Sequence, residues 1–168
     1  MIELVAYEPP LNEALFAFLD RCLPESGRSF DPTGRHAHLR RIEEAYEALW
    51  CLVEDGGAVV GCVGVRPLAP RRVRAQDAVR VRAAAGAGVG PTLKTLFVFE
   101  RLQGQGWGRR LAERAVAHAR EHGYAAVRLD TISTSKNAIA LYRRLGFEDI
   151  ERYDDNPMAD TFMELRLA

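Results

Sequence analysis

The order of apolar and polar residues along the chain predicts a mixed α/β protein. Apolar side chains alternate with polar ones in some segments and recur at helical spacing in others. The predicted order is strand, helix, helix, three strands, helix, strand, helix and two strands, over residues 1–7, 11–23, 35–47, 49–54, 58–65, 92–100, 107–122, 125–131, 133–145, 147–153 and 161–167. Gly123 and Gly146 are expected to end the last two helices, and a Ser or Thr to begin the last one.

Segment 66–91 interrupts this pattern. Six arginines lie between Arg66 and Arg82, and small residues fill 83–90. This composition predicts a long, mobile insertion between two strands. A weak alternation at 79–82 also fits an edge strand, and the sequence leaves both interpretations open.

Size and composition fit one domain over 1–168. The 168 residues are 48% hydrophobic and 27% charged, as is typical of a globular domain. The 23 Lys and Arg balance 23 Asp and Glu, which argues against a nucleic-acid partner. The three cysteines match no metal or redox spacing, and we expect no metal. No signal sequence or membrane-spanning apolar run is seen, so we expect a cytoplasmic protein without a membrane partner.

The glycine-rich segment Gln103-Gly-Gln-Gly-Trp-Gly-Arg109 lies between a predicted strand and a predicted helix. Such a turn lets several backbone N–H groups converge on one anion at the positive end of the helix. Arg109 and Arg110 add positive charge beside it. The segment therefore predicts a phosphate or pyrophosphate site.

Two well-known nucleotide-binding motifs fit this turn less well. A P-loop is excluded because no Gly-Lys-Ser/Thr ends the segment. Asp130 lies at the spacing that a dinucleotide site needs, but the four strands predicted before the turn disfavour that topology. An ordinary tight turn before a helix stays open as the simplest alternative.

Two motifs resemble the GNAT superfamily of N-acetyltransferases, most closely its bacterial small-molecule or amine acetyltransferases. Gln103-x-x-Gly106-x-Gly108 is similar to the acetyl-CoA signature of that family, and LYRRLGFE at 141–148 to the end of its last helix. The resemblance is close over 92–168 and loose over 49–65. It implies the GNAT acyl-CoA N-acyltransferase fold, a central mixed sheet of about six to seven strands flanked by about four helices.

The resemblance also implies roles for individual residues. The Val98 N–H would donate to the thioester carbonyl and stabilise its oxyanion. Tyr142 would act as the general acid that protonates the CoA thiolate, although its place on the helix also fits a half-buried core tyrosine. The expected acetyl-CoA-binding residues are Phe97, Val98, Phe99, Gln103, Gly104, Gln105, Gly106, Trp107, Gly108, Arg109, Asn137 and Tyr142.

The sequence assigns no general base. Similar sequences carry Glu at the start of the strand where this chain has Thr92. Glu100 lies near the end of the same strand but close to the phosphates, where a base is poorly placed. Asp130, His36 and His38 are candidates, but each also fits an ordinary structural position. Deprotonation through water, or an amine that arrives neutral, needs no dedicated base.

The acceptor side is expected in the segment Tyr153-Asp-Asp-Asn-Pro157. It resembles a bacterial group with Tyr-x-x-Asn-Pro at this place, so Tyr153, Asp154 and Asn156 would line the amine pocket. A solvated turn rich in Asp, Asn and Pro fits equally well.

Two functions follow from these observations. The first is an enzyme that transfers an acetyl group from acetyl-CoA to a primary amine, on a small molecule or a protein, through a tetrahedral intermediate. The second is a sensor that binds acyl-CoA without turnover. Basic residues at 66–82 and acids at 148–160 suit a polyanionic donor and a cationic amine. The exposed final strands are compatible with a homodimer.

Overall fold

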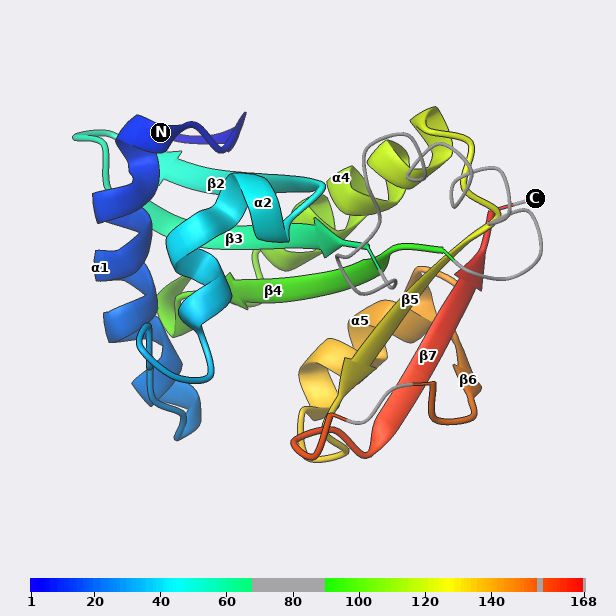
Figure 1. The fold of residues 1–168 in the computed structure, drawn as a ribbon. Coiled ribbons are helices and arrows are strands. Elements are labelled where there is room, and N and C mark those ends of the chain that lie inside the picture. The colour runs from blue at the N-terminus through cyan, green and yellow to red at the C-terminus, as the bar shows by residue number, and fades with distance from the viewer. Residues whose placement is uncertain (68–89, 154–155, 168) are drawn as a thin grey trace. The chain divides into compact units, whose positions relative to one another are not determined.

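The elements of the fold follow the order that the sequence predicts. The computed structural model describes residues 1–67, 90–153 and 156–167. Seven strands form a mixed sheet in the order β1-β2-β3-β4-β5-β7-β6 (Figure 1). The strands are β1 (Ile2–Ala6), β2 (Ala48–Glu54), β3 (Val59–Arg66), β4 (Thr92–Val98), β5 (Ala126–Thr131), β6 (Glu148–Ile150) and β7 (Thr161–Arg166), and the described α-helices are α1 (Asn12–Cys22), α2 (Ile42–Ala45), α4 (Trp107–Glu121) and α5 (Lys136–Arg144).

The predicted α/β class with a mixed sheet is confirmed. Strands β4 and β5 pair in parallel at Thr92 with Arg128 and at Leu93 with Leu129, whereas β1–β2, β2–β3, β5–β7 and β6–β7 are antiparallel. Most of the predicted insertion, including the possible strand at 79–82, lies outside the described residues.

The chain divides into two compact units. The N-terminal unit contains Met1–Arg66 and Thr95–Ala112, and the C-terminal unit contains Pro67–Lys94 and Glu113–Ala168. Strand β4 and helix α4 therefore contribute residues to both units.

In the N-terminal unit, helices α1 and α2 lie on one side of the β2–β3 hairpin (Figure 1). The helical spacing of α1 buries Leu15, Phe18, Leu19 and Cys22 in one stripe. These side chains form a single hydrophobic cluster with residues of the hairpin and with the end of β4. At the hairpin turn Gly56 and Gly57 have φ of 97° and 87°, which glycine adopts without steric cost.

The predicted helix over 35–47 is wrong in length and partly in type. Residues Ala37–Arg41 form a 3₁₀ helix, and α2 adds one turn that ends at Ala45. Tyr46 is already extended, with φ −113° and ψ 142°. The reason lies in the sheet, because the Glu47 N–H donates to the Val65 carbonyl at 2.8 Å and strand pairing begins there.

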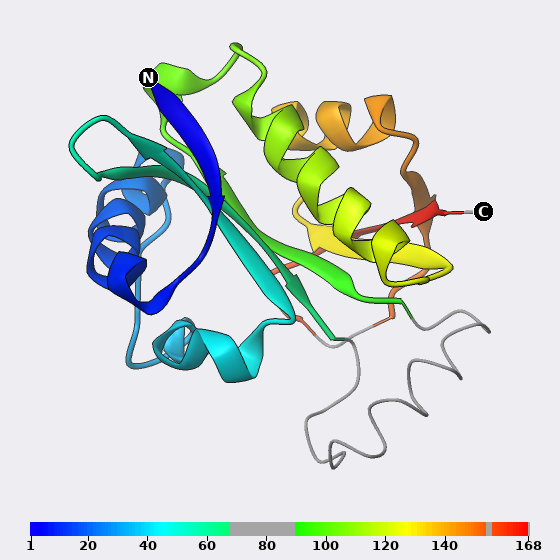
Figure 2. The ribbon, with the colours of Figure 1, turned by 90° about the horizontal axis from the view of Figure 1, so that it is seen from above.

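In the C-terminal unit the strands have one apolar and one polar face, as side-chain alternation requires. The apolar face is buried and consists of Leu93, Val127, Leu129, Met163 and Leu165. The second half of α4 and all of α5 lie on the same side of β5 and β7 (Figure 2). The opposite face is largely polar and carries Thr92, Lys94, Arg128, Asp130 and Glu164, together with the apolar Phe162 opposite Asp130.

Glycines end α4 and α5 as predicted. Gly123 has φ 73°, and the Tyr124 N–H donates to the Ala119 carbonyl at 3.0 Å. Gly146 has φ 100°, and the Phe147 N–H donates to the Tyr142 carbonyl at 3.0 Å. Both ends are Schellman motifs, in which a left-handed residue lets the next N–H satisfy a helix carbonyl.

The start of α5 and the ends of two strands differ from the prediction. The helix begins at Lys136, three residues after the predicted start at 133, and no side-chain hydrogen bond from Ser135 caps it. The Ser133 N–H and hydroxyl instead donate to the Asp160 carboxylate at 2.7 and 2.8 Å. Strand β4 ends at Val98 because a 3₁₀ helix over Glu100–Leu102 follows. Strand β6 ends at Ile150, although the predicted strand reached 153.

The three cysteines are free and buried. Burial raises the pKa of the Cys22 and Cys51 thiols to about 12, and that of Cys62 well above its ordinary value. In the part of the chain that the structure describes, no helix is long and apolar enough to cross a membrane.

Candidate functional site

The glycine-rich turn between β4 and α4 has the open backbone that an anion site needs. Gly104 and Gly106 have φ of 79° and 88°, in the left-handed region that favours glycine. A Cβ atom built on either glycine would meet no heavy atom of the described residues within 4 Å. Glycine is therefore required here by backbone conformation and not by crowding from the described residues.

Helix α4 begins directly after this turn and adds a positive helix end. The Arg110 N–H donates to the Gly106 carbonyl at 3.1 Å, which closes the first helical turn. The N–H groups before it are those that an α-helix leaves without intrahelical acceptors. Together with the helix dipole they form a natural site for a phosphate group.

Side chains of the turn hold it in place. The Gln103 Nε2 donates to the Val98 carbonyl at 3.3 Å, and the Gln105 Nε2 donates to the Arg101 carbonyl at 3.1 Å. These two bonds tie the turn to the end of β4 and to the 3₁₀ helix that follows it. Gln103 and Gln105 are both expected to bind acetyl-CoA, and the structure gives them this structural contact as well.

The arginines near the turn are not equivalent. Arg101 binds both carboxylate oxygens of Glu54, at 3.1 and 3.0 Å, so its charge is balanced. Arg110 lies with its guanidinium 4.8 Å from the Trp107 ring centre, a cation–π contact at the start of α4. Arg114 pairs with Glu121 at 3.5 Å.

The end of β4 is fixed by the hydrophobic cluster of the N-terminal unit. Phe99 packs edge-on against Phe18, with ring centres 4.8 Å apart, and Phe97 belongs to the same cluster. A side chain at Gly61 would approach the Phe97 carbonyl oxygen to 3.2 Å, so glycine allows the backbones to come close. The backbone of Phe97–Phe99, which the family resemblance predicts to bind acetyl-CoA, is thereby packed against this cluster.

Thr95, in the middle of β4, has φ 61°, which costs about 1–2 kcal/mol in a non-glycine residue. The hydroxyls of Thr95 and Tyr46 lie 2.6 Å apart and share a hydrogen bond. The Cys62 thiol donates to the Thr95 carbonyl at 3.1 Å. No sequence pattern pointed to Thr95, because a β-branched residue in a strand normally predicts extended backbone.

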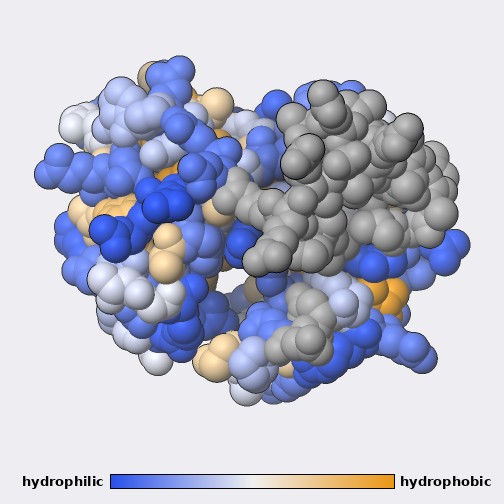
Figure 3. All heavy atoms as spheres, viewed as in Figure 1, coloured by the Kyte–Doolittle hydropathy of each residue, from blue (hydrophilic) through white to orange (hydrophobic). Residues whose placement is uncertain are grey.

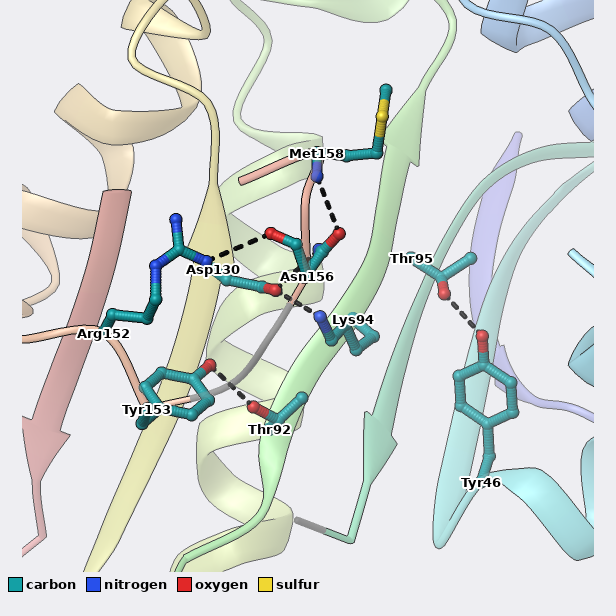
Figure 4. A network of polar contacts seen from close by, with 9 residues as sticks. All are labelled: Tyr46, Thr92, Lys94, Thr95, Asp130, Arg152, Tyr153, Asn156 and Met158. Atoms are coloured by element: carbon teal, nitrogen blue, oxygen red, sulfur yellow. Dashed lines mark hydrogen bonds and ion pairs between the residues drawn. The ribbon is translucent and has the colours of Figure 1, made fainter. Parts of the chain in front are cut away.

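The segment predicted to line the acceptor pocket binds to the polar face of the C-terminal unit (Figure 4). The Tyr153 and Thr92 hydroxyls lie 3.0 Å apart, and the Asn156 Nδ2 donates to Asp130 Oδ2 at 2.8 Å. Asp154, the third predicted residue, lies outside the described residues. The structure thus brings Tyr153 and Asn156 onto one face of one unit.

Charges on that face are balanced in pairs. Lys94 donates to Asp130 Oδ1, and Arg128 binds Glu164 Oε2 at 2.8 Å. The side of the molecule drawn in Figure 3 is mostly hydrophilic over the described residues. Sequence reasoning missed Lys94, although its two-residue spacing from Thr92 repeats that of Arg128 and Asp130 and indicates a shared polar face.

The structure weakens the candidates for a general base. Burial opposes ionisation of Asp130, but hydrogen bonds from Lys94 and Asn156 outweigh it, so the pKa of this carboxyl lies below its usual value. Burial lowers the pKa of His36, and its Nδ1 accepts the Asp31 N–H at 2.9 Å.

The other two candidates, His38 and Glu100, make contacts of their own, and Thr92 stands where similar sequences carry Glu. The His38 ring lies 5.7 Å from the Tyr46 ring, and the Glu100 N–H donates to Glu25 Oε2 at 2.8 Å. Thr92 is buried and hydrogen-bonded to Tyr153. No general base is assigned.

The two predicted site residues of α5 differ in exposure. Asn137 is exposed at the second position of the helix, and Tyr142 is 6% exposed, with its ring 5.8 Å from the Phe147 ring. Both lie in the C-terminal unit, whereas the glycine-rich turn lies in the N-terminal unit. Their roles stay predictions.

The chain has relatives among known acetyltransferases. The model of the acetyltransferase (GNAT) family matches residues 12–147. The uncharacterized N-acetyltransferase YjgM of Escherichia coli K12 is 33% identical over 146 residues, which cover 83% of this chain and 78% of that protein. The chain spans from 36% to 95% of the length of the curated relatives that it matches.

Solved structures share the fold. An acetyltransferase of the GNAT family from Staphylococcus aureus Mu50 matches with a TM-score of 0.79 over 100% of both chains, at 18% identity. The GNAT family N-acetyltransferase YhbS from E. coli, solved in complex with CoA, matches with a TM-score of 0.68 at 25% identity, over 99% of this chain and 82% of that one. The chain therefore belongs to the acetyltransferase (GNAT) family.

Proposed function

We propose that the protein transfers an acetyl group from acetyl-CoA to a primary amine, by direct attack of the amine on the thioester. The observation that carries this proposal is the open turn at Gly104 and Gly106, directly before α4. Its geometry fits a pyrophosphate, because a polyanion gains from converging N–H donors and from the helix dipole. The CoA bound in the related YhbS structure supports the same assignment.

The backbone binds the donor in this proposal. The N–H groups of residues 104–109 hold the pyrophosphate, and the backbone of Phe97–Phe99 holds the pantetheine arm. The Val98 N–H donates to the thioester carbonyl and stabilises the negative charge that develops on its oxygen during attack. Asn137 contacts the donor as the family resemblance implies.

Proton transfer completes the reaction. The amine nitrogen forms the new C–N bond, the C–S bond breaks, and Tyr142 gives its hydroxyl proton to the departing thiolate, while the nitrogen gives up one N–H proton that returns through water to the Tyr142 oxygen. The amine enters neutral or loses its proton to water, because Asp130 keeps a lowered pKa and is already bound to Lys94 and Asn156. The acceptor is a small molecule or a protein amine that approaches the side formed by Tyr153 and Asn156.

Release of CoA thiol tests the proposal. Purified protein is mixed with acetyl-CoA and a panel of primary amines, and free thiol is followed over time. Thiol release that requires both protein and amine supports an acetyltransferase. Acetyl-CoA binding without release for any amine would favour a sensor, and no binding would refute both functions.

The phosphate turn has its own test in Gly106→Glu. The new carboxylate would stand where the pyrophosphate is bound, so we expect loss of acetyl-CoA binding in calorimetry. Gly123→Glu is the matched control, since Gly123 also has a positive φ of 73° and open space around its Cβ, but lies at the other end of α4. Equal affinities in the two variants would contradict the assignment.

A further inference from the structure

Asp130 is the centre of a polar network in the C-terminal unit (Figure 4). Its side chain is only 2% exposed, and each carboxylate oxygen has a partner from a different part of the chain. Lys94 of β4 binds Oδ1, and Asn156 Nδ2 donates to Oδ2 at 2.8 Å. A buried carboxylate with two such partners is strongly fixed in direction.

Asn156 connects Asp130 to the residues around it through further hydrogen bonds. Its Oδ1 accepts the Met158 N–H at 3.0 Å, so both ends of the amide are engaged and its orientation is defined. Arg152 donates to the carbonyls of Asn156 and Ala159 at 3.2 and 2.9 Å. The described part of this segment is thus shaped by its own bonds and is joined to the sheet at Asp130.

Two further hydrogen bonds hold the ends of the segment. The Tyr153 hydroxyl is hydrogen-bonded to the Thr92 hydroxyl, and the Asp160 carboxylate accepts a hydrogen bond from the Ser133 hydroxyl. The bond between Asp130 and Asn156 lies between these ends and acts on the middle of the segment. Losing it would loosen the middle while the ends stay bound.

We propose that Asp130 is a positioning residue for the amine: through Asn156 it fixes the acceptor wall formed by the described residues 152–153 and 156–160. The inference rests on the proposed function, in which this segment lines the amine pocket. Attack requires the amine nitrogen to be held close to its reacting position, and a displacement of about 1 Å costs about 100-fold in rate. In this proposal Asp130 therefore affects the position of the amine during attack and not the binding of acetyl-CoA.

An exchange of the two side chains gives the sharpest test. Asn156→Asp places a second carboxylate against Asp130, and two carboxylates at this distance repel and cannot both stay ionised. We expect kcat/KM for the amine to fall about 10- to 100-fold at pH 8, with KM for acetyl-CoA unchanged. In the pair Asp130→Asn with Asn156→Asp, the amide and the carboxylate trade places, and most of the loss should be recovered.

A pH profile separates this role from a merely structural one. In Asn156→Asp alone, one proton shared between the two carboxylates restores a hydrogen bond. The loss of kcat/KM for the amine relative to wild type should therefore become smaller toward pH 5. Lys94, Arg128, Arg152, Glu164 and Tyr153 are the charged or titratable groups facing this site from the described residues. Because these groups are present in both proteins, the ratio of kcat/KM between variant and wild type at each pH removes their contribution to the pH profile.

Asp149→Asn is the matched control. Asp149, like Asp130, forms an ion pair, in its case with Arg143 at 3.0 Å, but its side chain is 61% exposed. Hydrogen exchange of the Met158 amide gives a readout independent of activity, and we expect it to be about tenfold faster in Asn156→Asp and unchanged in the control.

The outcomes separate two kinds of failure. An unchanged amine kcat/KM in Asn156→Asp, or no recovery in the exchanged pair, would overturn the positioning role even if the wild type is active. Faster Met158 exchange without any kinetic change would show that the segment is held but is not the acceptor wall. A wild type that binds acetyl-CoA and acetylates no amine would refute the proposed function, and this inference with it.

Discussion

Removing the Tyr46 hydroxyl tests whether one hydrogen bond holds the unusual backbone of Thr95. Tyr46→Phe keeps the ring, and with it the contact of the Arg66 guanidinium 5.5 Å from the ring centre. It removes only the 2.6 Å bond to the Thr95 hydroxyl. A hydrogen bond contributes about 1 kcal/mol, and a buried partner left without one adds to the loss. We expect Tyr46→Phe to lower the free energy of unfolding by about 1.5 kcal/mol.

Two substitutions of Thr95 separate the bond from the strain. Thr95→Ala loses the same bond and keeps the strained backbone, so it should cost about as much as Tyr46→Phe. Thr95→Gly loses the bond but removes about 1 kcal/mol of strain, so its net effect should be small. We therefore expect Thr95→Gly to be more stable than Thr95→Ala and Tyr46→Phe. A simple loss of packing would give the opposite order for the two Thr95 variants.

Urea unfolding at pH 7 measures these effects. A loss of about 1.5 kcal/mol lowers the midpoint by about 0.7 M if the slope is about 2 kcal/mol per M. The double variant Tyr46→Phe with Thr95→Ala should be destabilised no more than either single variant, because both remove one bond. Additive losses, or a Tyr46→Phe variant as stable as wild type, would refute the idea that the bond holds the positive φ of Thr95.

Two further changes concern the chemistry. Tyr142→Phe should lower kcat about 100-fold or more while leaving the Kd for acetyl-CoA unchanged in calorimetry, and an unaffected kcat would exclude Tyr142 as the acid. Asp130 has a pKa below its ordinary value of 3.8, so its stabilising contribution is complete above that value and is lost as pH falls through the folded-state pKa. The difference in unfolding free energy between wild type and Asp130→Asn should therefore be constant from pH 7 to about 5 and shrink below about pH 4, and a constant difference down to pH 3 would contradict this origin.

Local patterns predicted the features that depend on neighbouring residues. Alternation and helical spacing located the strands and helices, and Gly123 and Gly146 marked two helix ends through their need for positive φ. The glycine-rich turn could also be located from the sequence, because Gly104 and Gly106 likewise have the positive φ that favours glycine. Where a distant partner decides the backbone, the prediction failed: pairing of Glu47 with Val65 shortens the second helix.

The polar network was not predictable because its partners are far apart along the chain. Asp130 is 36 residues from Lys94 and 26 from Asn156, and Tyr153 is 61 from Thr92. Strand register brings them together, and register is a property of the folded sheet. The expected contrast between basic 66–82 and acidic 148–160 stays a prediction, since 68–89 lie outside the described residues. Within the acidic stretch, Asp149 and Asp160 are already bound to Arg143 and Ser133.

The buried cysteines determine what a thiol-specific dye will report. With a pKa of about 12, Cys22 and Cys51 are thiolates in only about one molecule in ten thousand at pH 8, and the dye reacts with thiolates. Cys62 is shielded in the same way. In a turnover assay the dye signal therefore comes from the thiol of released CoA, because the folded protein does not react with the dye. Once the chain unfolds, all three thiols become reactive, so the same dye counts unfolded molecules without any added label.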